Sequence, residues 1–77
     1  MVATIKNITT HYSDLHDVAR AIIEIEEDTM PILLIGPEAK MISECVPGTR
    51  IEIRIATQVT LIDNRQACLI DYAKIAA

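Results

Sequence analysis

Residues 50 to 61 alternate between two kinds of position with a period of two, and this pattern constrains the fold more than any other feature of the chain. The positions of one parity are largely aliphatic: Ile51, Ile53, Ile55, Thr57, Val59 and Leu61. The positions between them are mostly polar: Arg50, Glu52, Arg54, Ala56, Gln58 and Thr60. A period of two is that of an extended strand with one buried face. The segment therefore predicts one long strand, or two strands with a bend near residues 56 and 57.

Turn-forming residues at 63–66 predict that this strand is followed by a partner strand. With Asn64 and Arg65 at the tip of the turn, three inner-face pairs form: Leu61 with Cys68, Val59 with Ile70, and Thr57 with Tyr72. Arg65 is unfavourable as the second residue of a type I′ turn, so a four-residue loop is the alternative. We predict an antiparallel C-terminal hairpin in which Tyr72 points inward.

The same register leaves apolar residues on the outer face of the hairpin. Ile62 lies opposite Ala67, and Thr60 lies opposite Leu69. Contiguous exposed apolar side chains usually mark a site of association, and a chain this small gains stability from oligomerisation. We therefore predict a homodimer whose interface includes Ile62, Ala67 and Leu69. The alternative is that helices of the same chain cover this face.

The N-terminal half predicts a β-α-β unit. Residues 2–10 are rich in Val, Ile and Thr, which favours a strand. Ser13 fits a helix N-cap, and apolar residues then recur at spacings of three and four, which predicts an amphipathic helix over 14–27. The alternative is that "IIEIEE" at 22–27 begins a strand. The four consecutive aliphatic residues 32–35 predict a central strand buried on both faces.

Gly36, Pro37 and Glu38 predict the start of a short second helix that reaches Glu44 or Cys45, because proline suits the first position of a helix. No repeat, linker or low-complexity stretch divides the chain. The predicted fold class is therefore α+β, with residues 1–77 forming one small compact domain. A β-α-β unit, a short helix and a C-terminal antiparallel β-hairpin share one mixed sheet.

Negative charge is concentrated in one segment. The chain has a net charge of −4, and residues 14–28 hold six acidic residues and one arginine, a local balance of 1 − 6 = −5. This balance argues against general nucleic-acid binding, which depends on Lys and Arg side chains. We predict that the acidic helix binds a basic partner protein through Asp17, Glu24, Glu26, Glu27 and Asp28. The alternative is the ordinary charged exterior of a helix.

A nucleic-acid-binding sheet is an alternative hypothesis. Arg50 and Arg54 lie on one face of the long strand and Arg65 at the tip of the hairpin, and strand faces of small barrels do bind single strands. Such surfaces need aromatic side chains on which bases stack, and Tyr72 is the only aromatic residue nearby. A solvated face on which Glu52 pairs with the arginines is the simpler interpretation.

Residues for metal binding or catalysis are few. His11 and His16 lie in "HYSDLHD", but a zinc site needs at least three converging ligands, and no serine or cysteine has a nucleophile motif around it. Cys45 and Cys68 form no Cys-x-x-Cys motif, so we predict two buried thiols. We expect no enzyme activity, no metal and no cofactor. A small metal-binding or enzymatic domain around His11 and His16 is the second alternative.

The longest uncharged apolar run, residues 30–36, is far shorter than the roughly 20 residues of a membrane-spanning helix. The first residues also lack the pattern of a secretory signal. We therefore expect a cytoplasmic protein that does not bind membranes. The leading functional hypothesis is a non-enzymatic interaction or regulatory module. In size and charge the chain is similar to the acidic inhibitors and accessory factors of phages and mobile elements.

Overall fold

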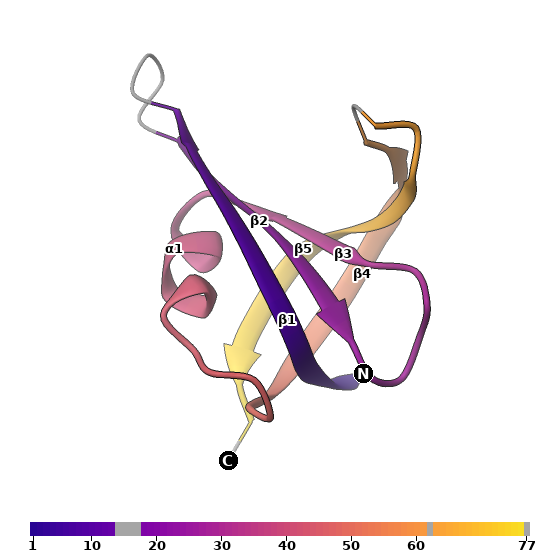
Figure 1. Ribbon diagram of the computed structural model, residues 1–77. Helices are drawn as coiled ribbons and strands as arrows, with labels where there is room; N and C mark the ends of the chain where they lie inside the picture. The colour runs from indigo at the N-terminus through magenta and orange to yellow at the C-terminus, as the bar shows by residue number, and fades with distance from the viewer. Residues whose placement is uncertain (14–17, 62, 77) are drawn as a thin grey trace.

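The computed structural model describes residues 1–13, 18–61 and 63–76 of the chain. Within these ranges the chain forms five strands and one short helix (Figure 1). In chain order they are β1 (Val2–Ser13), β2 (Val18–Ile25), β3 (Ile32–Ile35), α1 (Pro37–Ser43), β4 (Arg50–Thr60) and β5 (Gln66–Ile75). The predicted small domain with one mixed sheet is thus present, but strands make up more of it than expected.

The five strands close into a barrel in the order β1-β2-β3-β5-β4. Strand β1 pairs antiparallel with both β2 and β4, and β2 pairs antiparallel with β3. The pairing of β3 with β5 is parallel, and that of β4 with β5 is antiparallel. The sheet is therefore mixed, as predicted.

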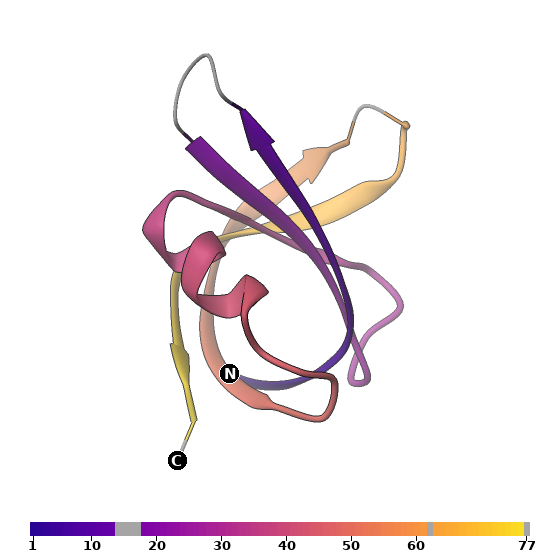
Figure 2. The ribbon, with the colours of Figure 1, turned by 60° about the vertical axis from the view of Figure 1, so that its left-hand side comes forward.

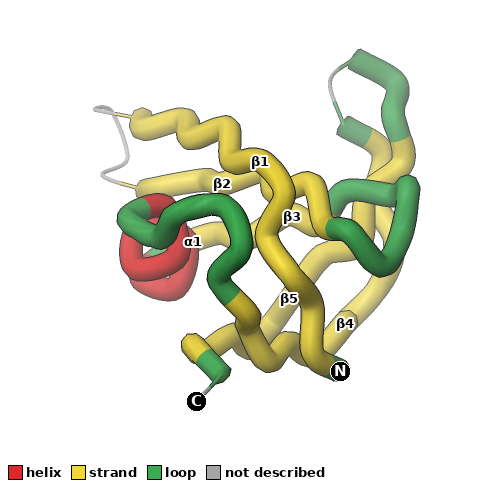
Figure 3. Tube along the Cα trace, turned by 60° about the horizontal axis from the view of Figure 1, so that its bottom comes forward, coloured by secondary structure: helices red, strands yellow, loops and turns green. Residues whose placement is uncertain are grey.

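Helix α1 packs against β1, β2, β3 and β5 (Figures 2 and 3). It starts at Pro37, as the sequence predicts, and it ends at Ser43, one or two residues earlier than expected. Gly36 precedes it with φ 94°, a conformation that a residue with a Cβ atom rarely adopts. Ala39 and Ile42 are fully buried, so the helix adds aliphatic side chains to the barrel core.

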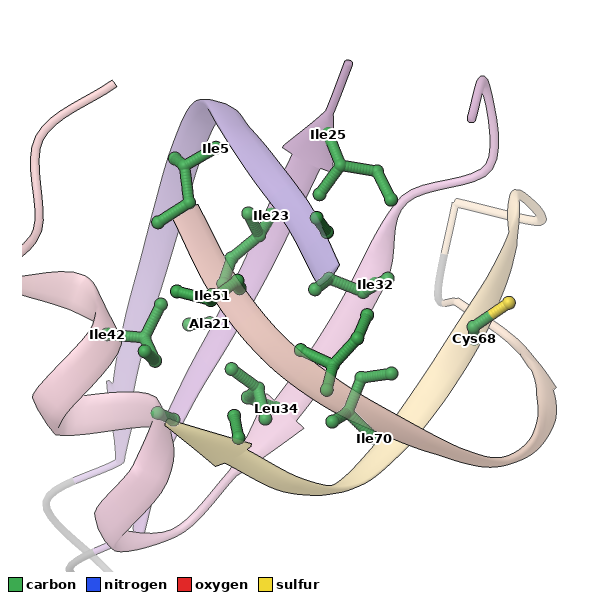
Figure 4. Close-up of a cluster of buried hydrophobic side chains, with 14 of the residues drawn as sticks. Ile5, Ala21, Ile23, Ile25, Ile32, Leu34, Ile42, Ile51, Cys68 and Ile70 are labelled. Carbon is green, nitrogen blue, oxygen red and sulfur yellow. The ribbon is translucent and has the colours of Figure 1, made fainter. Parts of the chain in front are cut away.

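The core is built from aliphatic side chains. Its largest fully buried members come from the strands and the helix, and they point toward one another inside the barrel (Figure 4). They are Ile5, Ile23, Ile32, Leu34, Ile42 and Ile51. Because the chain lacks Phe and Trp, branched aliphatic residues must supply this packing.

The predicted helix over 14–27 is wrong where the structure describes it, because residues 18–25 form β2. Residues 14–17 lie outside the described ranges. Ala19, Ala21, Ile23 and Ile25 are all buried inside the barrel, which is the period of two of a strand. Their neighbours Arg20 and Glu24 are exposed. Helical spacing and a period of two both fit this segment, and pairing with β1 on one side and β3 on the other selects the strand.

Three further details of the predicted β-α-β unit are also wrong. Strand β1 extends to Ser13, so this residue is not an N-cap. Strand β3 has β2 and β5 as neighbours, and no helical crossover joins it to β1. Only one face of β3 is buried, because Ile32 and Leu34 point into the core while Leu33 is half-buried and Ile35 is exposed.

The predicted antiparallel hairpin is present, but its register differs from the prediction. Strand β5 places Ala67 opposite Val59, Leu69 opposite Thr57, and Tyr72 opposite Arg54. Leu61 donates its N–H to the carbonyl of Arg65, and Asn64 has φ 68°. The loop therefore runs from Leu61 to Arg65 with Asn64 in a left-handed conformation, a known three-residue hairpin loop.

This loop shifts β5 by three positions relative to the predicted pairing. Cys68 and Ile70 are nevertheless buried, as predicted. The pairing shifts again between Arg54 and Ile55, where Asp71 has no partner on β4, and Tyr72 beyond this bulge lies opposite Arg54 and is 42% exposed. The prediction that Tyr72 points inward is therefore wrong.

The barrel has a closed half and an open half. In the closed half, residues 2–4 of β1 pair with residues 50–52 of β4, and Ile53 exchanges hydrogen bonds with Met1. Irregularities in pairing then occur around Lys6 in β1 and around Ala56 in β4. Beyond them the β1–β2 and β4–β5 hairpins diverge, which forms the open half (Figures 1 and 2). Such bulges bend a strand and increase its twist.

Candidate binding groove

A groove of about 580 Å³ lies in the open half, between the β1–β2 hairpin and the β4–β5 loop. Its lining comes from four strands and this loop. The lining residues are Thr9, Arg20, Ile22, Leu33, Ile35, Thr60, Leu61, Asp63 and Arg65. The groove thus combines an aliphatic floor with a polar rim.

The register of the strands explains why aliphatic side chains gather at the floor of the groove. Ile22 of β2 lies directly opposite Leu33 of β3, and Arg20 lies opposite Ile35. Paired residues share one face of a sheet, so these four side chains form a compact set on the outer face. Leu33 is in turn opposite Leu69 of β5, which extends the apolar row across three strands. Ile35 is 43% exposed, so part of this floor is open to solvent.

The rim carries two arginines and one carboxylate. The Nε of Arg65 donates to Oδ2 of Asp63 over 2.7 Å, and its backbone N–H donates to Oδ1 of the same residue. These bonds lower the pKa of Asp63 below its usual value. They also hold the Arg65 side chain at the groove, while Arg20 rises from the opposite wall. The groove thus has aliphatic contacts at its floor, the Arg20 guanidinium on one wall and the Arg65–Asp63 ion pair on the other.

The predicted self-association patch is only partly on the surface. Ala67 is fully buried, so it cannot contribute to an exposed interface. It also lies outside the main cluster of core side chains. Leu69 is half-buried, and it joins Ile22 and Leu33 in the apolar row described above. Ile62 lies outside the described residues. Of the three predicted residues only Leu69 adjoins an apolar outer face, and that face is centred on β2 and β3.

The acidic residues lie at the other end of β2, on its last residues and in the turn that follows, rather than on a helix. Glu24, Glu26, Glu27 and Asp28 line a second hollow of about 650 Å³ together with Lys6, Ile25 and Thr29. Asp17 lies outside the described residues. The carboxylate of Glu27 accepts the backbone N–H and the hydroxyl of Thr4, both over 2.7 Å. These two bonds lower the pKa of Glu27, and they fasten the β2–β3 turn to β1.

The three arginines of the nucleic-acid hypothesis do not form one surface. Arg50 pairs with Thr4 in the closed half, whereas Arg65 lies at the groove. The Nε of Arg54 donates to Oδ1 of Asp71 over 2.9 Å, and this ion pair raises the pKa of Arg54 and lowers that of Asp71. Most of the positive charge on β4 is thus already balanced.

One aromatic ring lies close to Arg54. The guanidinium carbon is 5.9 Å from the centre of the Tyr72 ring, within the range of a cation–π contact. On the same outer surface the Nζ of Lys74 lies 3.4 Å from Oε2 of Glu52, which raises the pKa of Lys74. The ring is therefore in contact with a side chain of its own molecule, on a surface where the charges alternate.

The region proposed for metal chemistry is largely outside the described ranges. His16 falls in the segment 14–17, and the backbone of His11 pairs with Arg20 in the β1–β2 ladder. Among the residues that the structure describes, no three His, Cys, Asp or Glu side chains are grouped to hold a metal ion. Cys68 is buried as predicted, Cys45 is half-buried, and neither is in a disulfide.

Comparison with protein-family models, with curated proteins and with solved structures finds no match to this chain. Within the described ranges, no helix has the length and apolar character needed to cross a membrane. Arg20, Ile22, Leu33 and Ile35 were not predicted as site residues. The outward positions of β2 and β3 would have identified Ile22, Leu33 and Ile35, because aliphatic residues stand there in place of the polar residues of a solvated face. Arg20 has no such signal in the sequence.

Proposed function

We propose that this chain is a non-enzymatic protein-interaction module that binds an extended, aliphatic segment of a partner protein, flanked by acidic residues, in the groove of the open half. The observation that carries the proposal is the aligned set of Ile22, Leu33 and Ile35 beneath a rim with Arg20 and Arg65. Aliphatic side chains of a partner would cover the floor, and its acidic side chains would pair with Arg20 and compete with Asp63 for Arg65.

The position of the groove on the barrel supports this proposal. Five-stranded, partly open Greek-key barrels of the OB-fold type bind oligonucleotides and oligosaccharides on the second and third strands, between the β1–β2 and β4–β5 loops. The groove of this chain lies at the same place. Fold alone does not define the ligand, so the chemistry of the lining must do so.

That chemistry favours a peptide over a nucleic acid. Single-stranded nucleic acids bind through basic grooves with aromatic side chains, and none of the residues recorded in the groove lining is aromatic. An aliphatic floor instead suits the Leu, Ile and Val side chains of an extended peptide.

A titration with three fluorescent probes tests this function. The first is a peptide with an aliphatic centre and Asp residues at both ends, the second has Lys in place of Asp, and the third is a single-stranded oligothymidine. We expect the Asp-flanked peptide to bind with the highest affinity. Preferential binding of the oligothymidine would overturn the peptide proposal in favour of a nucleic acid.

Two exposed isoleucines provide a matched pair of variants. Ile35 is 43% exposed in the groove, and Ile55 is 45% exposed on β4 outside it. Ile35→Asp removes an apolar contact and places a negative charge near the acidic peptide, so its affinity should fall about tenfold or more. Ile55→Asp should bind the peptide like the unmodified chain. Equal affinities of the two variants would contradict the assignment of the groove.

Docking of a basic partner protein on the acidic turn is a second proposal, supported by the four carboxylates that the fold gathers at the end of β2. It predicts that the Lys-flanked peptide binds better than the Asp-flanked one, and that Glu24→Lys abolishes this preference. A cytoplasmic location is also part of the proposal. It is supported by the two unpaired thiols, since disulfides are rare in reducing compartments.

A further inference from the structure

The outer edge of β4 is open over residues 54–60. The pairing of β4 with β1 ends at Glu52, and the bonds between Ile53 and Met1 are the last contacts between their backbones. From Arg54 to Thr60, β4 pairs only with β5 on its other side. In the part of the chain that the structure describes, no other strand hydrogen-bonds to this edge.

The hydrogen-bonding ladder shows which backbone groups point outward. The N–H of Leu61 donates to the carbonyl of Arg65, so these two residues form a hydrogen-bonded pair. Hydrogen-bonded and non-hydrogen-bonded pairs alternate along an antiparallel ladder. Gln58, opposite Cys68, and Thr60, opposite Gln66, therefore occupy non-hydrogen-bonded positions. Their N–H and C=O groups point away from β5, toward the open edge.

Between Thr57 and Thr60 this edge lacks the features that usually prevent strands from pairing. Natural proteins protect edge strands with lysine, proline, bulges or a covering helix. Strand β1 has Lys6 within a bulge, but residues 55–60 of β4 contain no charge and no proline. The irregularity at Ala56 ends before Thr57, and pairing with β5 is regular from Thr57 to Thr60. Among the described residues, α1 contacts the other four strands and not β4.

Symmetry favours a second copy of the chain as the occupant of this edge, and the lack of charge permits it. Two copies with a net charge of −4 repel each other over most of their surfaces. Residues 55–60 are an exception because they are uncharged, and Arg54 beside them is paired with Asp71. An antiparallel pair of two identical edges is also self-complementary, as two-fold symmetry requires.

We propose that the chain forms a two-fold symmetric dimer in which residues 58–60 of β4 pair antiparallel with the same residues of a second copy. With the symmetry axis at Val59, Gln58 of one copy lies directly opposite Thr60 of the other. The backbone groups of Gln58 and Thr60 then gain partners across the axis. The two barrels join into one continuous sheet, and the groove residues Ile22, Leu33 and Ile35 stay outside the interface.

Analytical ultracentrifugation over a wide range of concentration tests this dimer. The mass should rise from that of the 8.5 kDa monomer toward twice this value as concentration increases. Gln58→Pro removes the outward N–H without removing a bond to β5, so this variant should stay monomeric. A chain that is monomeric at all concentrations, or that forms assemblies larger than a dimer, would overturn the proposal.

A second variant keeps the test decisive if the proline disturbs the fold. Gln58→Lys places two like charges close to the symmetry axis, so it should be monomeric at low salt and dimerise when salt screens the charges. Val46→Lys, which adds the same charge at a residue 67% exposed in the segment before β4, is the control and should dimerise like the unmodified chain. Dimerisation of Gln58→Lys at low salt to the same extent as this control would rule out the β4 edge.

Discussion

The closed and open halves of the barrel use the same strands for different purposes. In the closed half, β1 and β4 pair with each other, and Ile5, Ile51 and Ile53 are buried between them and the rest of the barrel. In the open half the two strands separate, and aliphatic residues of β2 and β3 are left on a surface groove. The change between the two occurs at Lys6 and Ala56, where pairing is irregular.

This difference teaches how so small a chain combines stability with a binding surface. Complete closure would pair β1 with β4 along their whole length and leave no diverging hairpins. Instead, one half provides a packed core, and the other half is held open by two bulges. Stability and binding should therefore respond to substitutions in different halves.

The largest effect on stability is expected from a substitution in the closed half. Ile51 is fully buried where β1 meets β4, and Ile51→Ala should lower the free energy of unfolding by about 2 to 5 kcal/mol. Ile35→Ala, in the open half, should change it by less than about 0.5 kcal/mol. Urea unfolding of both variants measures this contrast. Equal losses would show that the two halves do not differ in their contribution to stability.

Two glycines test the same contrast with backbone changes. Gly36 and Gly48 have φ values of 94° and 95°. At neither position does a neighbouring atom lie close enough to clash with a new Cβ atom. Gly36 donates its N–H to Ala19 beside the groove, whereas Gly48 donates to Ile5 in the closed half. Replacing either glycine with alanine should lower the free energy of unfolding by about 1 to 3 kcal/mol through backbone strain alone.

Binding should separate these two variants. Gly36 directly follows Ile35, so Gly36→Ala should also weaken binding of the Asp-flanked peptide. Gly48→Ala should bind it like the unmodified chain at temperatures where both are folded. Fluorescence titration beside urea unfolding provides both readouts. A loss of binding in Gly48→Ala would mean that the closed half also shapes the groove.

Local signals in the sequence predicted some elements well. The alternation at 51–61 located β4, and Pro37 located the start of α1, because both depend on residues close in the chain. Residues 18–25 were assigned to a helix because Val18, Ala19, Ile22 and Ile23 also fit helical spacing. Only the pairing of β2 with two distant strands resolves this ambiguity, and strand preference depends strongly on such neighbours.

The candidate site was harder to predict than the fold. Leu69 was recognised as part of an outer apolar face, but its neighbours Leu33 and Ile22 come from strands whose register is unknown before folding. The loop at 61–65 added a second difficulty, since its length decides which residue of β4 lies opposite each residue of β5. A site assembled from three strands and a loop leaves little trace in any single segment.

The smallest effect is expected at the rim of the closed half, where Glu27 accepts two hydrogen bonds from Thr4. These bonds lower the pKa of Glu27 in the folded chain below its ordinary value of 4.5. The stability that the carboxylate provides is therefore fully present above pH 4.5, and it is lost as pH falls through the lower folded-state pKa.

Glu27→Gln should be slightly less stable than the unmodified chain near neutral pH and equally stable in strong acid. Glu24 lines the same hollow but does not accept these two hydrogen bonds, so Glu24→Gln is the control for general charge removal. Urea unfolding of the three chains at both pH values measures the difference, and a deficit of Glu27→Gln that persisted in acid would assign its effect to geometry rather than to charge.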